Sequence, residues 1–338
     1  MTGFPDWKLF KQTLAPFQQS YVELAAFLAV FLLVGLAMAF RSRQTGRHIV
    51  QALSLIVFFF VVNSCLGVFG LIRNGITGLS WTGKDDLRAF YWLGITVVIL
   101  CLSLHFGTAF CGWICPTGTL QEWIGWLRKA IRRSSLGKLN GPTTRAAIYL
   151  AGFGAFAWGT FHAFSTRRPL LEDSAVFWAS GLLLLTYLSH ERPQYDRALK
   201  RFRYVSLSLI VLFTIAGVQV TSPVHFVFTN VHDWASLLST LVIMGASLGV
   251  ARSWCRYLCP FGLASSFVGR YAPRRIRLTG PCGDCGHCDS ICETAAIQCG
   301  RVDVSACTMC LKCVDECPQA ALIVSHGLEP TAQAQEAA

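Results

Sequence analysis

The segment that decides the architecture reads C-G-D-C-G-H-C-D-S-I-C at residues 282–292 and C-T-M-C-L-K-C-V-D-E-C-P at residues 307–318. Each run has the spacing C-x2-C-x2-C-x3-C, which is the pattern of a bacterial two-cluster ferredoxin. In that pattern the first three cysteines of a run bind one iron–sulfur cluster, and the fourth cysteine binds the other. The sequence therefore predicts a small α+β domain that holds two [4Fe-4S] clusters.

The spacing divides the eight cysteines into two ligand sets. The first set is Cys282, Cys285, Cys288 and Cys317, and the second set is Cys292, Cys307, Cys310 and Cys313. Zinc sites usually take their ligands as two separated pairs, which does not match two runs of four cysteines. Disulfides need an oxidising compartment, whereas this segment is expected to face the cytoplasm. Glu293 departs from the pattern, because it stands where the first run would carry the proline that Pro318 provides in the second. We expect this change to alter the surroundings of one cluster without removing a ligand.

The rest of the chain is strongly apolar. Of 338 residues, 53% are hydrophobic and only 14% are charged, whereas soluble domains carry about 25% charged residues. Seven apolar segments are candidates to cross a bilayer, although one of them is short. They are Tyr21–Phe40, Ile49–Ile72, Phe90–Phe110, Ala146–Phe164, Val176–Ser189, Tyr204–Val220 and Trp234–Val250. The sequence therefore predicts an all-α polytopic membrane bundle of about seven spans with the ferredoxin domain at its C-terminal end.

The positive charge of the chain is unevenly distributed. The net charge of +11 could suggest a nucleic-acid partner, but Lys and Arg gather between the apolar segments, at residues 41–48, 116–145, 190–203 and 251–278. This distribution follows the positive-inside rule, so we expect a membrane protein with a cytoplasmic ferredoxin domain and no nucleic-acid partner. The expected divisions are an N-terminal segment, the transmembrane domain, the ferredoxin domain and a disordered tail, at residues 1–20, 21–278, 279–325 and 326–338.

A second cysteine motif occurs twice. The segments C-G-W-I-C-P and C-R-Y-L-C-P begin at Cys111 and Cys255, and each follows an apolar segment and precedes a glycine and an apolar helix. The copies are offset by 144 residues and point the same way, which indicates a parallel internal repeat. After the first copy, Thr117–Ser134 is expected to form an amphipathic helix at the membrane surface.

The cysteines of this motif have three candidate roles. They are Cys111, Cys115, Cys255 and Cys259. Cysteines four residues apart share a helix face, and the repeat could bring both pairs together to hold a third metal centre, with iron–sulfur favoured. Redox chemistry is the second role: a disulfide within one motif is disfavoured, because Cβ atoms at this spacing lie about 5–6 Å apart and a disulfide needs about 3.8 Å. In the third role the thiols only pack the docking site of the ferredoxin domain.

Two kinds of charged or ionisable side chain are further candidates. His105 lies in the third apolar segment, six residues before Cys111. An ionisable residue in a membrane segment is a candidate quinone or proton contact, with a hydrogen-bonded core histidine as the alternative. Arg252 and Arg256 could dock an acidic donor or the acidic face of the ferredoxin segment, although positive-inside topology accounts for them equally.

On these motifs the chain resembles the membrane iron–sulfur proteins of the NapH/NosR type, which include the CcoG-, MauN- and YccM-like proteins. The resemblance rests on both C-x3-C-P motifs and the eight ferredoxin cysteines, and it covers roughly residues 49–325. It implies a bacterial inner-membrane protein that passes electrons between the quinone pool or a cytoplasmic donor and a membrane or periplasmic redox partner. The length is closest to that of NapH- or YccM-like members.

The resemblance leaves the branch of the family open. NosR-type members carry a flavin attached through threonine, and we find neither an attachment motif nor a spaced histidine pair, so we expect no flavin and no haem. The sequence also has no nucleophile–base set and no phosphate loop, which favours an electron-transfer component, such as a quinol dehydrogenase subunit, over a stand-alone enzyme. The alternatives are a copper or thiol maturation factor that uses the C-x3-C-P cysteines, and a redox-sensing regulator.

Overall fold

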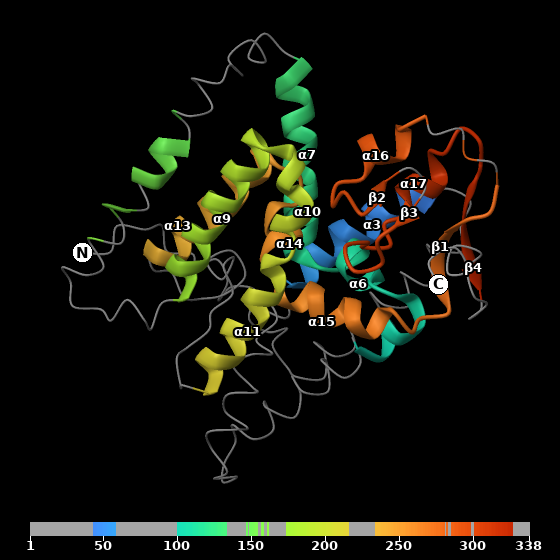
Figure 1. Cartoon of the computed structure of the whole chain (residues 1–338), viewed down its shortest axis with the longest axis horizontal. Helices are drawn as coiled ribbons and strands as arrows, with labels where there is room; N and C mark the ends of the chain where they lie inside the picture. The colour runs from blue at the N-terminus through green and yellow to red at the C-terminus, as the bar shows by residue number, and fades with distance from the viewer. Residues whose placement is uncertain are drawn as a thin grey trace.

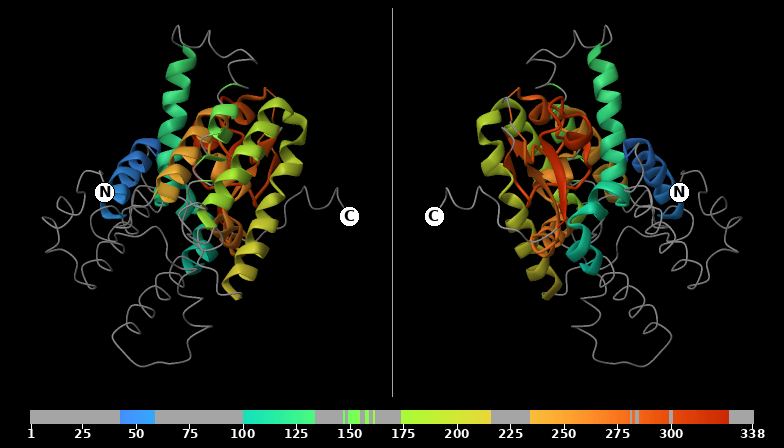
Figure 2. Two further views of the ribbon diagram at one scale, coloured as in Figure 1. Left: turned by 90° about the vertical axis from the view of Figure 1, so that its left-hand side faces the viewer. Right: turned by 90° about the vertical axis from the view of Figure 1, so that its right-hand side faces the viewer.

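The computed structural model describes residues 43–58, 100–133, 149–154, 174–215, 234–280, 285–298 and 301–326, and the single positions 147, 157, 158, 161 and 282. Most of this structure is helical, and two small sheets lie at one side with the C-terminal residues (Figure 1). The views in Figure 2 show this orange and red C-terminal part packed against the helices.

The helices are short to medium in length. They are α3 (Arg43–Ile56), α6 (Ala109–Trp113), α7 (Pro116–Arg133), α9 (Ser174–Glu191), α10 (Asp196–Leu199), α11 (Phe202–Ile215), α13 (Trp234–Gly249), α14 (Ser253–Tyr257), α15 (Pro260–Gly269), α16 (His287–Ile291) and α17 (Lys312–Asp315), with the 3-10 turn η4 (Pro193–Tyr195). Helix α13 packs on α9 and α7, and α11 packs on α15. Trp113, Leu182, Ile243 and Tyr257 are fully buried in the shared core, where removal of apolar surface from water stabilises the packing.

Helix α7 confirms the helix expected at Thr117–Ser134, but its buried side differs from the expectation. It begins at Pro116, whose fixed φ and missing amide hydrogen suit the first helical position. The polar residues Gln121 and Glu122 are buried, whereas Leu127 is 53% exposed. Buried polar side chains such as these need hydrogen-bonding or charged partners. The residues that partner Glu122 are part of the site described below.

The C-terminal residues form two small antiparallel sheets. Strands β1 (Arg274–Leu278) and β4 (Leu322–His326) pair with Ile276 opposite Val324. Strands β2 (Ile297–Gln298) and β3 (Arg301–Val302) form the second pair. The first sheet joins the two ends of the ferredoxin segment, and it uses residues just before position 279, where the sequence placed the domain boundary.

The prediction of an all-α bundle with seven membrane spans is wrong. Among the ranges that the structure describes, no helix is both long enough and apolar enough to cross a bilayer. A crossing takes about 20 predominantly apolar residues. Helix α9 has 18 residues but ends in His190 and Glu191, and α13 and α11 have 16 and 14 residues. The same finding contradicts the predicted multi-pass inner-membrane location.

The physical reason is visible where two of the predicted spans lie. Segments Val176–Ser189 and Trp234–Val250 fall in α9 and α13, and Ala179, Leu183 and Val242 from these helices bury each other. Some of their apolar side chains therefore serve helix packing, whereas others, such as Leu184 and Leu241, are 50% and 59% exposed. Composition alone does not distinguish these environments. The other predicted spans lie wholly or partly outside the described residues, namely Tyr21–Phe40, Ile49–Ile72, Phe90–Phe110, Ala146–Phe164 and Tyr204–Val220.

Candidate functional site

The two C-x3-C-P copies have the same local structure. Each begins as a five-residue helix, α6 or α14, and is followed by a helix that starts at the proline. The backbone amide of Cys115 donates to Phe110 O at 2.9 Å, and that of Cys259 donates to Trp254 O at 2.9 Å. This wide turn ends each short helix and turns the chain into the next one. The matching geometry supports the internal repeat expected from the sequence.

The structure brings thiols from both copies together. The four motif cysteines are half-buried and pack on one core; they are Cys111, Cys115, Cys255 and Cys259. Burial raises the pKa of Cys111 above its ordinary range, and the charges of Cys259 and Cys255 raise it further. Burial and Cys259 raise the pKa of Cys255 to about 12. Gln121 Nε2 donates to Cys255 Sγ at 3.4 Å, and the Gly262 amide donates to Cys259 Sγ at 3.3 Å.

One set of ferredoxin cysteines lies at the surface. We call Cys282, Cys285, Cys288 and Cys317 the outer quartet; the first two are exposed and the others are half-buried. Burial raises the pKa of Cys288 to about 11, and the charges of Cys317, Cys285 and Cys282 contribute to the rise. The four thiols that the spacing assigned to one cluster are therefore neighbours.

The other set lies deeper. We call Cys292, Cys307, Cys310 and Cys313 the inner quartet; Cys313 is buried and the others are half-buried. Burial raises the pKa of Cys313, and the charges of Cys310, Cys307 and Cys292 add to the rise. The Ala296 amide donates to Cys292 Sγ at 3.2 Å. Cys288 of the outer quartet also contributes to the rise in the pKa of Cys313, so the assignment of the eight cysteines to two clusters stays a prediction from their spacing.

The chain around the inner quartet is tightly turned. Met309 and Leu311, which flank Cys310, have φ angles of 51° and 63°, in the left-handed region that is unfavourable for side chains other than glycine. The Met309 amide donates to Cys307 Sγ at 3.4 Å. Strained residues of this kind cluster at functional sites, and here they turn the backbone so that its thiols and amides face one another.

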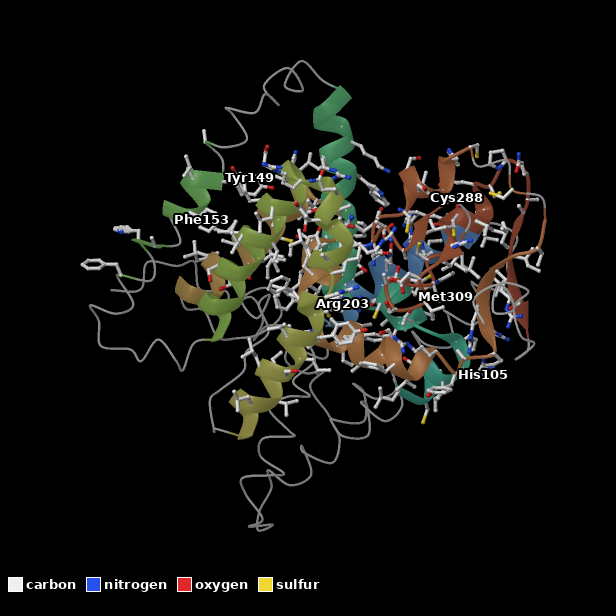
Figure 3. The ribbon with its side chains drawn as sticks, in the orientation of Figure 1. His105, Tyr149, Phe153, Arg203, Cys288 and Met309 are labelled. Carbon is white, nitrogen blue, oxygen red and sulfur yellow. The ribbon has the colours of Figure 1, made fainter. Side chains whose placement is uncertain are left out.

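The inner quartet rests directly on the first C-x3-C-P copy. Trp113 Nε1 donates to Met309 O at 2.9 Å, and the Thr108 hydroxyl donates to Cys307 O. A Cβ atom on Gly112 would lie 2.3 Å from Thr308 O, so only glycine permits this approach of the two backbones. Figure 3 shows Met309 close to the α6 ribbon and Cys288, of the outer quartet, farther out on α16.

The buried carboxylate of Glu122 forms ion pairs with three cationic side chains near this contact. Glu122 is fully buried and accepts hydrogen bonds from Arg47 at 2.9 and 2.5 Å. It also pairs with Lys312 Nζ at 2.8 Å and with the Arg252 guanidinium. Burial alone would raise the pKa of Glu122, but Arg252, Arg47 and Lys312 outweigh it and hold this pKa well below its usual range. The carboxylate is therefore ionised and binds helices α3 and α7 to the inner quartet.

The sequence did not single out Glu122, Arg47 or Lys312 as site residues. The available signal was the position of Glu122, an acidic residue six positions after Pro116 in a chain with few acidic residues. On the expected amphipathic helix it would face solvent. Only the fold shows that its partners arrive from α3 and from the ferredoxin segment.

Glu293, the departure from the ferredoxin pattern, is part of the same contact. It accepts hydrogen bonds from Arg252 Nε at 2.9 Å and from Lys312 Nζ at 2.6 Å. Arg252 thus binds the ferredoxin segment, as one of the two sequence interpretations proposed, but at a half-buried glutamate beside the inner quartet. Arg256 instead pairs with Asp196, at 2.6 Å.

The comparisons with known proteins agree with this arrangement. A family model described as a 4Fe-4S binding domain matches residues 88–134 and again residues 233–279, so each match covers one C-x3-C-P copy. YccM of Escherichia coli, named as an electron transport protein, is 28% identical over 70% of this chain and 56% of its own length. MJ0750 of Methanocaldococcus jannaschii is 27% identical over 85% of this chain and 97% of its own length. The ferredoxin-type protein NapH of Haemophilus influenzae is 21% identical over 72% of this chain and 71% of its own length.

The family-model matches, together with relatives named YccM, NirI, NapH, NosR and MauN, support the NapH/NosR/MauN/YccM-type family. This confirms the resemblance expected from the cysteine motifs, and the ferredoxin-type names of the relatives support a general role in electron transfer. The chain spans only about half the length of YccM. No solved structure matches it.

The cysteines fit the iron–sulfur clusters of this NapH/NosR-type family. Within the described ranges, no three or more His, Cys, Asp or Glu side chains converge closely enough to hold one metal ion. The cysteines in those ranges also form no disulfide. A [4Fe-4S] cluster is larger than one ion and takes a separate thiolate at each iron. Quartets of cysteines outside disulfides, with backbone amides donating to Cys292 and Cys307 in the inner one, therefore suit a cluster better than a mononuclear site.

His105 does not join these groups. Its side chain is exposed, and its ring stands edge-on to that of Phe106 with the centroids 4.8 Å apart. Figure 3 shows it at the opposite end of the C-terminal part from Cys288. Because the membrane span that motivated a quinone contact is contradicted, the structure gives His105 no such role.

Proposed function

We propose that the protein relays single electrons through two [4Fe-4S] clusters, one held by the outer quartet and one by the inner quartet. The observation that carries this proposal is the spacing of the eight cysteines, which has the ligand pattern of a two-cluster ferredoxin; the mutual electrostatic influence of these thiols supports it. When bound, such clusters accept and donate one electron at a time. The residues of this chain then hold the thiolates, exclude water and set the local charge.

The outer quartet is suited to exchange electrons with a partner protein. Cys282 and Cys285 are exposed, so a partner could approach this edge closely. His287 and Glu316 lie beside it with side chains 41% and 48% exposed, and such a polar rim is typical of transient protein contacts. We therefore propose a redox protein as the partner at this edge.

The inner quartet is suited to pass electrons into the protein. Its surroundings are protein groups, including the Trp113 indole and the backbone of α6. The half-buried Cys111 belongs to that helix. An electron that enters at the outer quartet would thus reach the C-x3-C-P cysteines through the inner quartet.

We further propose that the C-x3-C-P cysteines hold a third iron–sulfur centre. Two observations favour it: the 4Fe-4S family model matches both copies, and the sulfurs of Cys255 and Cys259 accept N–H hydrogen bonds. Hydrogen bonds to sulfur are a means by which proteins tune such centres. Copper binding or thiol exchange at the same cysteines is the alternative, and it would indicate a maturation factor.

The proposal is tested by counting iron, copper and acid-labile sulfide per chain after anaerobic purification. We expect at least about eight irons in the wild type, and a loss of about four in both Cys285→Ser and Cys310→Ser. Iron above eight that is lost when all four C-x3-C-P cysteines are changed to Ser would establish the third centre. Unchanged iron in the quartet variants would overturn the two-cluster relay. Eight irons both in the wild type and in the fourfold variant would overturn the third centre, and bound copper would favour the maturation factor.

A further inference from the structure

Four charged side chains form a closed ring beside the inner quartet. Arg252 pairs with both Glu122 and Glu293, and Lys312 pairs with the same two carboxylates at 2.8 and 2.6 Å. Positive and negative groups therefore alternate around the ring. The side chains of Arg252 and Glu122 are 2% and 0% exposed, and those of Lys312 and Glu293 are 12% and 13% exposed. The ring is thus nearly closed to water.

Two residues of the ring are adjacent in the sequence to cysteines of the inner quartet. Glu293 directly follows Cys292, and Lys312 lies between Cys310 and Cys313. Two members of the ring are therefore covalent neighbours of ligand cysteines. The corresponding neighbour of the outer quartet's last cysteine is Pro318, which carries no charge.

The other two members belong to the helical part. Glu122 lies on α7, and Arg252 precedes α14 and donates through Nη1 to Cys111 O at 3.2 Å. Arg252 has a φ of 49°, in the left-handed region. A non-glycine residue keeps such an unfavourable conformation only when its surroundings hold it there. The strain points to a specific need for this guanidinium at this place.

The buried charges do not balance. Arg47 joins the ring through Glu122, and its side chain is 0% exposed. Among the residues that the structure describes, three cations therefore share these two carboxylates, which leaves a surplus of one positive charge in a region of low dielectric constant. A buried charge without a counter-charge is costly, so a negative group is expected next to it.

We propose that this ring and Arg47 are the electrostatic partner of the inner quartet, stabilising the reduced and more negative state of the cluster that these cysteines hold. The inference rests on the proposed function, because it needs a cluster at that place. Lys312 and Arg252 are positioning and tuning residues, and the two glutamates hold their cationic groups in place. The outer quartet faces water instead and lacks such a ring among its described neighbours.

The inference is tested by redox titration of the whole protein, followed by electron paramagnetic resonance. Cys285→Ser and Cys310→Ser first assign the outer and inner signals. Lys312→Gln should lower the midpoint of the inner signal, with about a tenfold drop in the ratio of reduced to oxidised cluster at a fixed potential, equivalent to ~59 mV for one electron. Glu293→Gln should raise the same midpoint, and the double variant should return toward the wild type.

Glu316→Gln is the matched control, because it removes one negative charge beside Cys317 of the outer quartet at a side chain that is 48% exposed. We expect solvent screening to leave the inner midpoint unchanged in this variant. Shifts of the same sign in Lys312→Gln and Glu293→Gln, or shifts no larger than in the control, would overturn the inference. If a variant loses its inner iron, Lys312→Arg must restore both the iron and the midpoint, and failure to do so would also overturn it. Absence of a second cluster signal in the wild type would instead refute the proposed function.

Discussion

The outer and inner quartets have the same cysteine spacing and different surroundings. The outer quartet has two exposed cysteines and an exposed His287–Glu316 pair at 3.8 Å. The inner quartet has one buried cysteine, lies on α6, and is bordered by a ring of buried charges. The shared spacing determines which cysteines can bind a cluster, whereas the surroundings determine access and local charge.

The difference shows how a ferredoxin segment becomes part of a larger protein. The inner side is joined by charges, by backbone hydrogen bonds and by a close approach at Gly112. The outer side remains free for contact with another molecule. Changes on the inner side should therefore have large effects on stability, and equivalent changes on the outer side should have small ones.

The largest effect is expected from Glu122→Gln. The amide preserves the shape but leaves Arg47, Arg252 and Lys312 without their shared carboxylate. Removing one partner from a buried ionic network costs about 3–5 kcal/mol, so the free energy of unfolding in urea should fall by that amount. Glu316→Gln should change it by no more than about 0.5 kcal/mol. Equal stability of the two variants would remove the distinction between the two sides.

Gly112→Ala should have the next largest effect. The added Cβ would meet Thr308 O at 2.3 Å and push the inner run away from α6. Overpacking of this kind costs about 1–3 kcal/mol, and we expect faster alkylation of the inner cysteines in apoprotein. Gly125→Ala is the control, because a Cβ there meets no atom within 4 Å. The control should be neutral or stabilising by up to ~1 kcal/mol, as expected for a helix interior.

Trp113→Phe tests a single hydrogen bond of the same contact. It removes the donor to Met309 O and leaves that carbonyl without its indole partner. The loss of unfolding free energy should be roughly 1 kcal/mol, measured by urea denaturation. Trp126→Phe provides the comparison, since Trp126 is 40% exposed. A larger loss in Trp126→Phe would show that the indole hydrogen bond contributes little to docking.

The smallest effect is expected from His287→Gln on the outer side. It removes the exposed contact between His287 and Glu316, and exposed contacts of this kind contribute about 0–1 kcal/mol. Iron content and the urea midpoint should both stay at their wild-type values. A marked loss of outer-quartet iron in this variant would mean that the exposed rim is structurally important, contrary to the comparison.

Local features of the fold and site were predictable from the sequence. The helix after Pro116 could be predicted from its apolar pattern, and the spacing of the cysteines predicts two ligand sets. Glu293 could be recognised as unusual because the ferredoxin pattern has a proline at that position. These features depend on residues close together in the chain.

Features that depend on distant residues were not predictable. The membrane spans were wrong because the apolar residues of α9 and α13 pack on each other. The burial of Glu122 depends on Arg47, Arg252 and Lys312, which come from three separate parts of the chain. A hydropathy pattern on one helix cannot show which side will meet such partners.

The most direct test of the account is the rate of iron removal by a chelator from anaerobically purified protein. In the variant with all four C-x3-C-P cysteines changed to Ser, we predict two phases of about four irons each, a fast one from the outer quartet and a slow one from the inner quartet. Cys285→Ser should retain only the slow phase, and Cys310→Ser only the fast phase. A single phase for all the iron, or the opposite assignment of the phases, would contradict the distinction between an exposed and an enclosed cluster.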